Sequence, residues 1–463
     1  MKTQYLRGTG QPDIFMERKS MSTDFGRGSI GGILLKIAPP VMLAQLIQAL
    51  YNIVDSFFVG MYSDDALTAL SVIYPLQLVI IALAVGTGVG VNTYMARAYA
   101  HGDNEEAEGA AGTGLFLALL SWAVYALVAL PIMRPYVMTS SRMPGAVEYA
   151  VTYGNIVSLG SVGVFLEGNF SKVHQARGNM RRPMVAQIVG ATINIVLDPI
   201  LIFGFLFIPP MGVAGAAVAT VIGQLTSATI VAPGAARRPP FGKKFTRYIR
   251  HIYYYGYSSI LMQLLFTVYI VALNVILAGF SDAAVTVLGL YYKLQSFFFI
   301  PLFGLQTCIV PVLSYNYESG RYDRCRETMR LSFLISLVFM IAGVICFVFF
   351  PDAMAGIFSQ SASVHEIADV AFPIIGAGFF SAVFALMAPT FFQAIGAGGR
   401  SAFLSLLRQV FCLIPLFYVF SLLGLNASWI AFPLSETISG VVGFLMYIAE
   451  IRRWKKRGNV PQA

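Results

Sequence analysis

Long apolar stretches recur along the whole chain and are separated by short polar segments. A helix that crosses the hydrocarbon core of a bilayer needs roughly 20 apolar residues, and twelve stretches reach that length. They cover residues 34–60, 66–96, 110–132, 150–170, 184–207, 212–233, 252–279, 284–316, 331–350, 367–394, 402–424 and 427–450. Apolar and polar positions do not alternate within them, which excludes membrane strands. The pattern predicts an all-α membrane protein with twelve transmembrane helices.

The composition is that of a membrane protein. Of the 463 residues, 57% are hydrophobic and 11% are charged, whereas a soluble domain carries about 25% charged residues. The 31 Lys and Arg exceed the 22 Asp and Glu, which gives a formal net charge of +9. On a soluble surface this excess would suggest a nucleic-acid partner. In a membrane protein its meaning depends on which loops carry it.

The Lys and Arg residues gather on one side of the predicted membrane. The N-terminal arm, the loops after the fourth, sixth and eighth stretches, and the C-terminal tail carry most of them, whereas the opposite loops hold Arg134 and Arg142. Because cytoplasmic loops are enriched in Lys and Arg, we expect a multi-pass protein of the plasma (inner) membrane with both termini in the cytoplasm. The bilayer is then the expected partner, and no nucleic acid is. The polar segment before the first stretch lacks an apolar core, so no cleavable signal is expected.

The chain contains an internal repeat. Residues 45–102 match residues 263–320 without a gap, at Gln, Tyr, Ser, Asp, Thr and Gly positions as well as at apolar ones. Each copy holds six apolar stretches, which predicts two pseudo-symmetric six-helix lobes with a binding site between them, as in rocking transporters. We expect a cytoplasmic N-terminal arm (1–33), an N-lobe (34–235), a cytoplasmic linker (236–251), a C-lobe (252–450) and a basic cytoplasmic tail (451–463).

Two acidic residues fall inside apolar stretches of the N-lobe. Asp55 lies in the first stretch and Asp198 in the fifth, where a charged group costs at least about 2.5 to 3.5 kcal/mol and is a functional candidate. Asn194 precedes Asp198 by one helical turn on the same face, and Thr220 lies at a similar depth in the sixth stretch. Pro199 has no amide proton, so it frees one carbonyl of the preceding turn. Together these oxygens predict a site for Na⁺ or H⁺.

The C-lobe copy lacks these acids. In the register of the repeat Asp55 falls on Leu273, and the Asp-Pro region corresponds to Ile414–Pro415. The cation site is therefore expected in the N-lobe alone. Two alternatives are that Asp55 is hydrated near the membrane surface and that Asp198 is a structural side chain beside a proline kink.

Other polar and aromatic residues are candidates for the cleft between the lobes, where aromatic faces would contact a lipophilic or cationic guest. Helix packing is the alternative use of these rings. The candidates are Gln45, Tyr51, Asn52, Gln263, Tyr292, Lys293 and Gln295. Lys293 either lines the cavity or extends to the membrane surface. Pro39, Pro40 and Pro199 are the predicted flex points.

The remaining groups favour a transporter over an enzyme. Glu436 and Arg408 are expected to form a structural ion pair, and Glu167 to join a gate or an interface salt bridge. No phosphate-binding loop occurs, and no polar segment is long enough for an ATPase. The four cysteines lack metal-ligand spacing, and the four histidines lie near loops. We expect transport driven by an ion gradient, without a cofactor.

Four segments resemble motifs of the multidrug and toxic compound extrusion (MATE) family. They are residues 52–60 (NIVDSFFVG), 175–179 (QARGN), 194–199 (NIVLDP) and 212–220 (GVAGAAVAT). The resemblance implies a cation-coupled exporter with a V-shaped central cleft. In the DinF-like prokaryotic branch it implies that the cation or proton site is formed by Asp55, Asn194, Asp198 and Thr220. A second branch has acids in its seventh and tenth helices, whereas here residues 252–279 contain none and residues 367–394 contain only Asp369.

The expected function is secondary active export by a monomer. Antiport of H⁺ or Na⁺ would drive lipophilic or cationic organic compounds outward as the lobes rock against each other. The alternative is a flippase or an exporter of a lipid-linked or endogenous metabolite. Few basic side chains are available in the C-lobe spans to hold a pyrophosphate, since Lys293 and Arg408 are the clear ones.

Overall fold

The computed structural model describes residues 23–140, 144–242, 244–357 and 361–458, and within these ranges the chain is helical, with no sheet. We call residues up to the end of α7 the N-half. Its helices are α1 (Ile30–Tyr62), α2 (Asp64–Ala100), α3 (Asn104–Ser140), α4 (Pro144–Gly160), α5 (Val162–Ala176), α6 (Arg181–Phe203) and α7 (Val213–Val231). The C-half contains α8 (Phe245–Ala278), α9 (Asp282–Phe298), α10 (Ile300–Glu318), α11 (Tyr322–Phe349), α12 (Pro351–Gly356), α13 (Ala362–Gly376), α14 (Phe379–Ala394), α15 (Gly398–Leu406), the π-helical segment η2 (Leu407–Leu413), α16 (Ile414–Ser421), α17 (Leu425–Ser428) and α18 (Ala431–Gly458).

The described helices account for the twelve predicted spans. Nine are long and apolar enough to cross a membrane, and the number is twelve when three bent pairs each count as one span. The three pairs are bent within the span, since α4–α5, α9–α10 and α13–α14 bend by 41°, 55° and 55°. Pro301 at the start of α10 cannot donate to the preceding turn. Gly160 and Gly376 end α4 and α13, where a flexible backbone favours a helix end.

Some helix ends differ from the boundaries expected from sequence. The predicted span 184–207 is too long, because α6 ends at Phe203 and Gly204 follows with a φ of 82°. Helix α1 begins at Ile30, inside the expected N-terminal arm, and α8 begins at Phe245, inside the expected linker. Helix α18 continues to Gly458, inside the expected tail. Apolar length therefore finds the spans but not the polar turns that extend them.

The helix ends repeat in the register found in the sequence. Helix α2 begins at Asp64 and ends at Ala100, and at the matching positions of the second copy α9 begins at Asp282 and α10 ends at Glu318. The turns that follow also match, since Gly102 and Gly320 have φ values of 76° and 70°. Gly178 and Gly396 form a second such pair, with 75° and 79°. This left-handed backbone is one that glycine adopts without strain, so the repeat extends to turn geometry.

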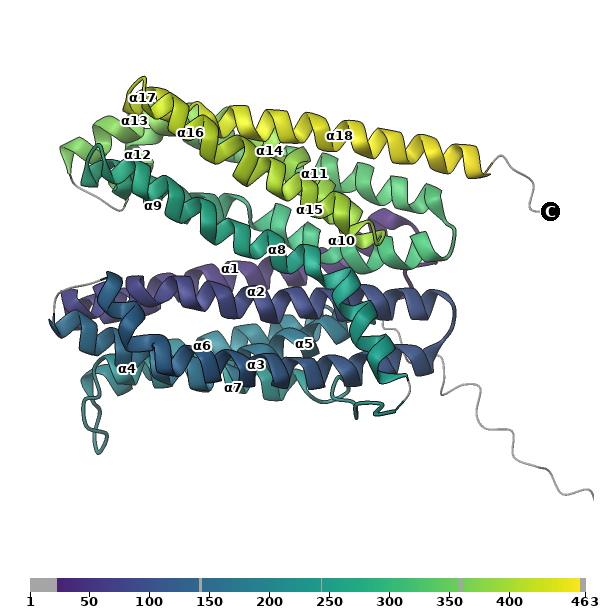
Figure 1. Cartoon of the computed structure of the whole chain (residues 1–463), viewed down its shortest axis with the longest axis horizontal. Coiled ribbons are helices and arrows are strands. Elements are labelled where there is room, and N and C mark those ends of the chain that lie inside the picture. Colours follow the sequence, from purple (N-terminus) through teal and green to yellow (C-terminus); the bar gives the residue numbers. More distant parts are fainter. Residues whose placement is uncertain (1–22, 141–143, 243, 358–360, 459–463) are drawn as a thin grey trace, which may run out of the picture.

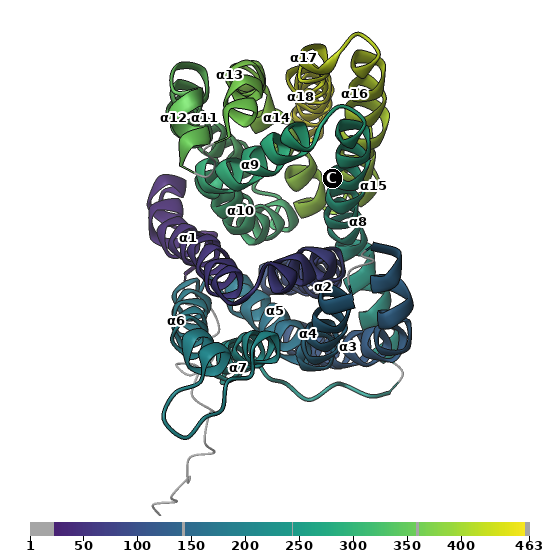
Figure 2. The same cartoon turned by 90° about the vertical axis from the view of Figure 1, so that its left-hand side faces the viewer.

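The two halves form two groups of helices. Figure 1 shows α1 to α7 below and α9 to α18 above, whereas α8 begins beside the lower group and crosses into the upper one. Figure 2, viewed from the end, shows α1 and α2 on the side of the N-half that faces α8, α9 and α10. Helix α8 follows the loop after α7 and packs against α2. The contact between α2 and α8 therefore joins the halves.

Glycines allow α2 and α8 to approach closely. A Cβ atom on Gly90 would stand 2.1 Å from the carbonyl oxygen of Ile252, and one on Gly86 would stand 2.3 Å from Cγ1 of Ile260. Polar contacts continue this seam toward the end of the molecule where α18 ends (Figure 1). There Arg97 of α2 donates to Glu318 of α10 at 2.6 Å. Small residues commonly allow such close helix contacts in membranes.

We predict that Gly90→Ala destabilises the protein, because its methyl group would collide with rigid backbone. Overpacking of this kind costs about 1–3 kcal/mol. Gly289→Ala on α9 is the matched control, since a Cβ there meets nothing within 4 Å. Thermal unfolding of the purified protein should show a lower midpoint for Gly90→Ala and an unchanged or higher one for Gly289→Ala. Equal midpoints for the two variants would contradict the close-packed seam.

Candidate functional site

Close packing of α6 on α7 brings the two helices of the predicted cation site together. A Cβ on Gly223 would stand 2.7 Å from the carbonyl oxygen of Gly190 and 3.1 Å from Cβ of Asn194. Further along, a Cβ on Gly215 would stand 2.4 Å from the carbonyl oxygen of Leu201. The glycines leave no room for side chains between the backbones. The polar groups next to them are therefore forced into contact.

Asn194 bridges Asp198 and Thr220. In the orientation that satisfies both ends of its amide, Nδ2 donates to Oδ2 of Asp198 at 3.1 Å, and Oδ1 accepts from the backbone N–H of Thr220 at 3.0 Å. In the other orientation Nδ2 reaches Oδ1 of Asp198 at 3.3 Å and Oγ1 of Thr220 at 3.4 Å. The spacing of four residues predicted that Asn194 and Asp198 share a face. The contact to Thr220 adds the third member of the site.

Asp55 joins this group from α1, which packs against α6. Its carboxylate interacts electrostatically with that of Asp198. Tyr51, one turn earlier on α1, lies close enough to interact with both acids and with the hydroxyl of Thr220. The structure therefore brings the four predicted site residues together and adds Tyr51, which was predicted only for the cleft.

The site is shielded from water and lacks a basic partner. Asp198 has an exposed fraction of 0% and Asp55 of 7%, and both Asn194 and Thr220 are buried. Oδ1 of Asp55 is buried and has no hydrogen-bond partner within the described part of the chain. Neither acid forms an ion pair with any Lys or Arg that the structure describes. Two buried carboxylates without a counter-charge favour binding of a proton or a hard cation.

Sequence reasoning missed two further members of this cluster, Tyr153 and Gln77. Tyr153 of α4 interacts electrostatically with Asp55, and its hydroxyl accepts from Nε2 of Gln77 at 3.4 Å. Gln77 and Gln295 match in the repeat, but that match alone did not indicate that Gln77 faces the acids. The missing information was the packing of α4 on α2 and of α2 on α1.

The C-half has a different polar cluster at the related place. Leu273, which corresponds to Asp55, is fully buried. In strict register Asp198 corresponds to Leu416, and Ile414–Pro415 stands just before it, so no acid occurs there in either alignment. Nη1 of Arg408 instead donates to Oε1 of Glu436 at 2.7 Å. The structure thus forms the ion pair expected between these two residues.

The predicted cleft residues occupy three helices. Gln45, Tyr51 and Asn52 lie on α1, Gln263 on α8, and Tyr292, Lys293 and Gln295 on α9. Tyr292 packs against Phe266, Tyr269 and Tyr291, so its ring contributes to helix packing. Lys293 and Asn52 are exposed and the other candidates are half-buried. A cavity lies between Arg97 of α2 and Arg400 of α15, and none of these seven residues lines it.

The prolines predicted as flex points lie inside helices. Pro39 and Pro40 lie within α1, and Pro199 lies within α6, without ending either helix.

Glu167 accepts from Ser171 at 2.6 Å, and among the described residues it forms no ion pair, so the predicted salt bridge is absent there. The nearby Lys172 donates to Gln175 at 2.9 Å. Lys172 follows the fourth predicted stretch (150–170), where a cytoplasmic loop was expected, but it lies inside α5.

Comparisons with known proteins cover both halves of the chain. The MatE family model matches residues 40–200 and 258–419, one segment in each half. The multidrug export protein MepA of Staphylococcus saprophyticus is 22% identical over 432 residues, which cover 91% of this chain and 94% of MepA. A "probable multidrug resistance protein NorM" of Thermotoga maritima is 25% identical over 445 residues, which cover 92% of this chain and 93% of NorM.

Solved structures of similar fold cover nearly the whole chain. One is a MATE protein in complex with MaL6, and another is described as the outward-facing conformation of a multidrug resistance MATE family transporter of the MOP superfamily. Each has a TM-score of 0.87 and 24% sequence identity, and covers 93% of this chain and 98% of its own. The chain therefore belongs to the MatE family of multidrug and toxic compound extrusion transporters, the family indicated by its sequence motifs.

Proposed function

We propose that this transporter is a secondary active exporter that exchanges H⁺ or Na⁺ for lipophilic or cationic organic compounds. The names of MepA and NorM, a multidrug export protein and a probable multidrug resistance protein, support this substrate class. The observation that carries the coupling is the buried acid pair Asp55 and Asp198 without a basic partner among the described residues. A DinF-like, N-lobe-coupled mechanism follows from the position of this pair.

The proposed coupling step is cation binding between the acids. Two carboxylates that share a water-poor site repel each other, and a proton or Na⁺ between them removes that repulsion. Asn194 and Thr220 add neutral oxygens at the same place, and hard cations favour such oxygen ligands. The site has one fewer net negative charge after binding. The pair thus senses the ion gradient directly.

Helix α1 is the proposed link between the cation and the two halves. It carries Asp55, packs against α6, and also packs against α10 of the C-half. At that second contact Sγ of Cys308 donates to the carbonyl oxygen of Ile37 at 3.4 Å. Drawing Asp55 toward Asp198 would therefore shift α1 against the C-half, with Pro39, Pro40 and Pro199 as flex points. Such a shift would bias the rocking of the lobes.

The proposed substrate cleft lies between the halves, beside the predicted candidates on α1, α8 and α9. Tyr51 connects this cleft with the cation site, because it was selected as a cleft residue and also interacts with both acids. A cationic guest near Tyr51 would compete with the coupling ion for the same carboxylates. We further propose a monomer in the plasma membrane with both termini in the cytoplasm.

We predict that Asp198→Asn lowers ion-driven efflux by about tenfold or more, because it removes one of the two charges that bind the cation. The assay follows a fluorescent lipophilic cation leaving proteoliposomes under a pH gradient or a Na⁺ gradient. Asp352→Asn is the control, since it removes a carboxylate whose side chain is 69% exposed. The coupling role is wrong if Asp198→Asn transports as well as the parent under both gradients.

Thr220 gives a finer test of cation ligation. Thr220→Val removes the hydroxyl and should raise the ion concentration needed for half-maximal transport by about fivefold, as one neutral hydrogen bond is worth about 1 kcal/mol. Thr220→Ser retains the hydroxyl and should restore the parent value. If Thr220→Val requires no more ion than Thr220→Ser, the hydroxyl is not part of the site.

The Arg408–Glu436 pair should affect stability rather than coupling. Glu436→Gln leaves a buried guanidinium without its partner, which costs about 3–5 kcal/mol, so the thermal unfolding midpoint should fall. The double variant Arg408→Met with Glu436→Gln removes both charges and should recover most of that midpoint. Transport by the double variant should retain its dependence on the ion gradient. Loss of that dependence in a stable double variant would assign a coupling role to the C-half pair.

A further inference from the structure

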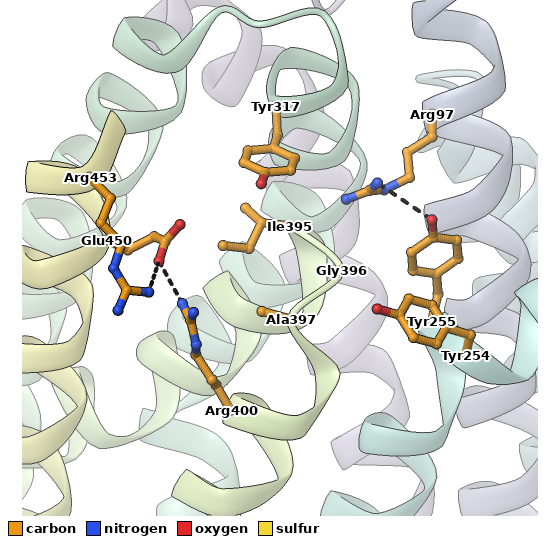
Figure 3. A pocket seen from close by; sticks show the side chains of 10 residues that line it. All are labelled: Arg97, Tyr254, Tyr255, Tyr317, Ile395, Gly396, Ala397, Arg400, Glu450 and Arg453. Carbon is orange, nitrogen blue, oxygen red and sulfur yellow. Dashed lines mark hydrogen bonds and ion pairs between the residues drawn. The ribbon is translucent and has the colours of Figure 1, made fainter. Parts of the chain in front are cut away.

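A cavity of about 430 Å³ lies at the seam between the halves, away from the acid pair. Figure 3 shows Arg97, Tyr254 and Tyr255 on one side of it and Arg400, Glu450 and Arg453 on the other. The remaining lining residues are Tyr317, Ile395, Gly396 and Ala397. Arg97 belongs to α2 of the N-half, whereas all the other lining residues belong to the C-half. The cavity is therefore shared by both halves.

Arg97 presents unused donors at this cavity. Its Nη1 donates to Glu318 at 2.6 Å and to the hydroxyl of Tyr255 at 3.4 Å. Its Nε and Nη2 are buried and have no acceptor within the described part of the chain. The guanidinium lies over the rings of Tyr255 and Tyr317, at 4.8 and 5.5 Å from the ring centroids, which fixes its plane. Two donors of Arg97 are therefore left unsatisfied where its side chain lines the cavity.

Gly396 allows Arg97 to reach the C-half. It has a φ of 79°, and a Cβ there would stand 2.9 Å from Nη2 of Arg97. Any side chain at this position would be strained and would also contact the guanidinium. The glycine therefore leaves the space that the end of Arg97 occupies beside the cavity.

Across the cavity, one carboxylate is shared by two guanidinium groups. Oε2 of Glu450 accepts from Nη1 of Arg400 at 2.5 Å and from Nη1 of Arg453 at 3.4 Å. Its other oxygen accepts from Nε1 of Trp454 at 3.1 Å. The lining thus holds three guanidinium groups and one carboxylate, and Glu318 behind Arg97 adds a second. The net charge of these five groups is positive, which favours an anionic acceptor for the unsatisfied donors of Arg97.

We propose that this cavity binds a phosphate group, carried either by an anionic phospholipid or by a soluble phosphate compound. Guanidinium groups bind phosphate oxygens through paired, charge-assisted hydrogen bonds. Tyr254 is 57% exposed beside the cavity, and Trp454 stacks on Tyr322 nearby. Aromatic rings with this arrangement are typical of the headgroup level of a membrane, where lipid phosphates also lie.

The position of the cavity gives the phosphate a role in conformation. Arg97 comes from one half and Arg400 from the other, so a phosphate group that bridges them would do so only while this seam is closed. A ligand that binds one arrangement more tightly shifts the population toward it. Phosphate binding should therefore stabilise the arrangement in which α2 and α8 are packed together.

The test measures thermal unfolding of the full-length protein in nanodiscs. We expect phosphatidylglycerol, inorganic phosphate added to phosphatidylcholine nanodiscs, or both to raise the unfolding midpoint above that in phosphatidylcholine alone. A rise with phosphatidylglycerol alone identifies a lipid phosphate as the ligand. A rise with inorganic phosphate identifies a soluble phosphate. Either result supports the site, and the absence of a rise with both probes overturns it.

Three variants separate the site from general charge effects. Arg400→Gln should weaken phosphate binding by about tenfold or more, because it removes charge-assisted hydrogen bonds, and it leaves the Arg97–Glu318 pair intact. Ala397→Leu fills the cavity without changing charge, should also abolish the rise, and serves if Arg400→Gln does not fold. Arg134→Gln is the control, since Arg134 pairs with Glu148 on an exposed surface outside the cavity. A full rise in Arg400→Gln and Ala397→Leu, or an equal loss in Arg134→Gln, overturns the proposal.

Discussion

Two carboxylates kept out of water, without a counter-charge among the described residues, are the constraint on which the account depends. Asp55 and Asp198 come from different helices, and the packing of α1 on α6 brings them together. The close packing of α6 on α7 at Gly223 and Gly190 then places Thr220 in contact with Asn194. A buried arrangement of this kind is unfavourable until a cation joins it. An ion gradient can therefore change the charge of this site, because it sets how often a cation is bound there.

The repeat distributes two kinds of polar cluster between otherwise similar halves. In the C-half, Arg408 and Glu436 satisfy each other's charge, and that cluster needs no external ion. Tyr269 lies beside this pair and Tyr51 beside the N-half acids, and the two tyrosines occupy matching positions in the repeat. The C-half thus carries an ion pair that is already neutralised, and the N-half carries two acids that form no ion pair among the described residues. Helix α1, in contact with both α6 and α10, connects them.

The spans, the repeat and the shared depth of the acids could be predicted from the sequence, because each depends on a local pattern of residues. Apolar length located the spans, and the register of the internal repeat anticipated matching helix ends such as Ala100 and Glu318. The depth of Asp55 and Asp198 pointed to one site, because helical rise converts residue number into depth. The bends within three spans, the position of Lys172 inside α5, and the contacts of Tyr153 depend on packing between distant segments. No single-sequence pattern carries that information, and the cavity at Arg97 was missed for the same reason.

The most direct test of the cation site is an infrared difference spectrum of the purified parent protein between acidic and alkaline buffer. It needs neither substrate nor a gradient and reports carboxyl groups that gain or lose a proton. The account predicts a pH-dependent band from a buried carboxyl group that is lost in both Asp55→Asn and Asp198→Asn, and that Na⁺ suppresses if Na⁺ is the coupling ion. An identical spectrum for the parent and both variants would contradict the account.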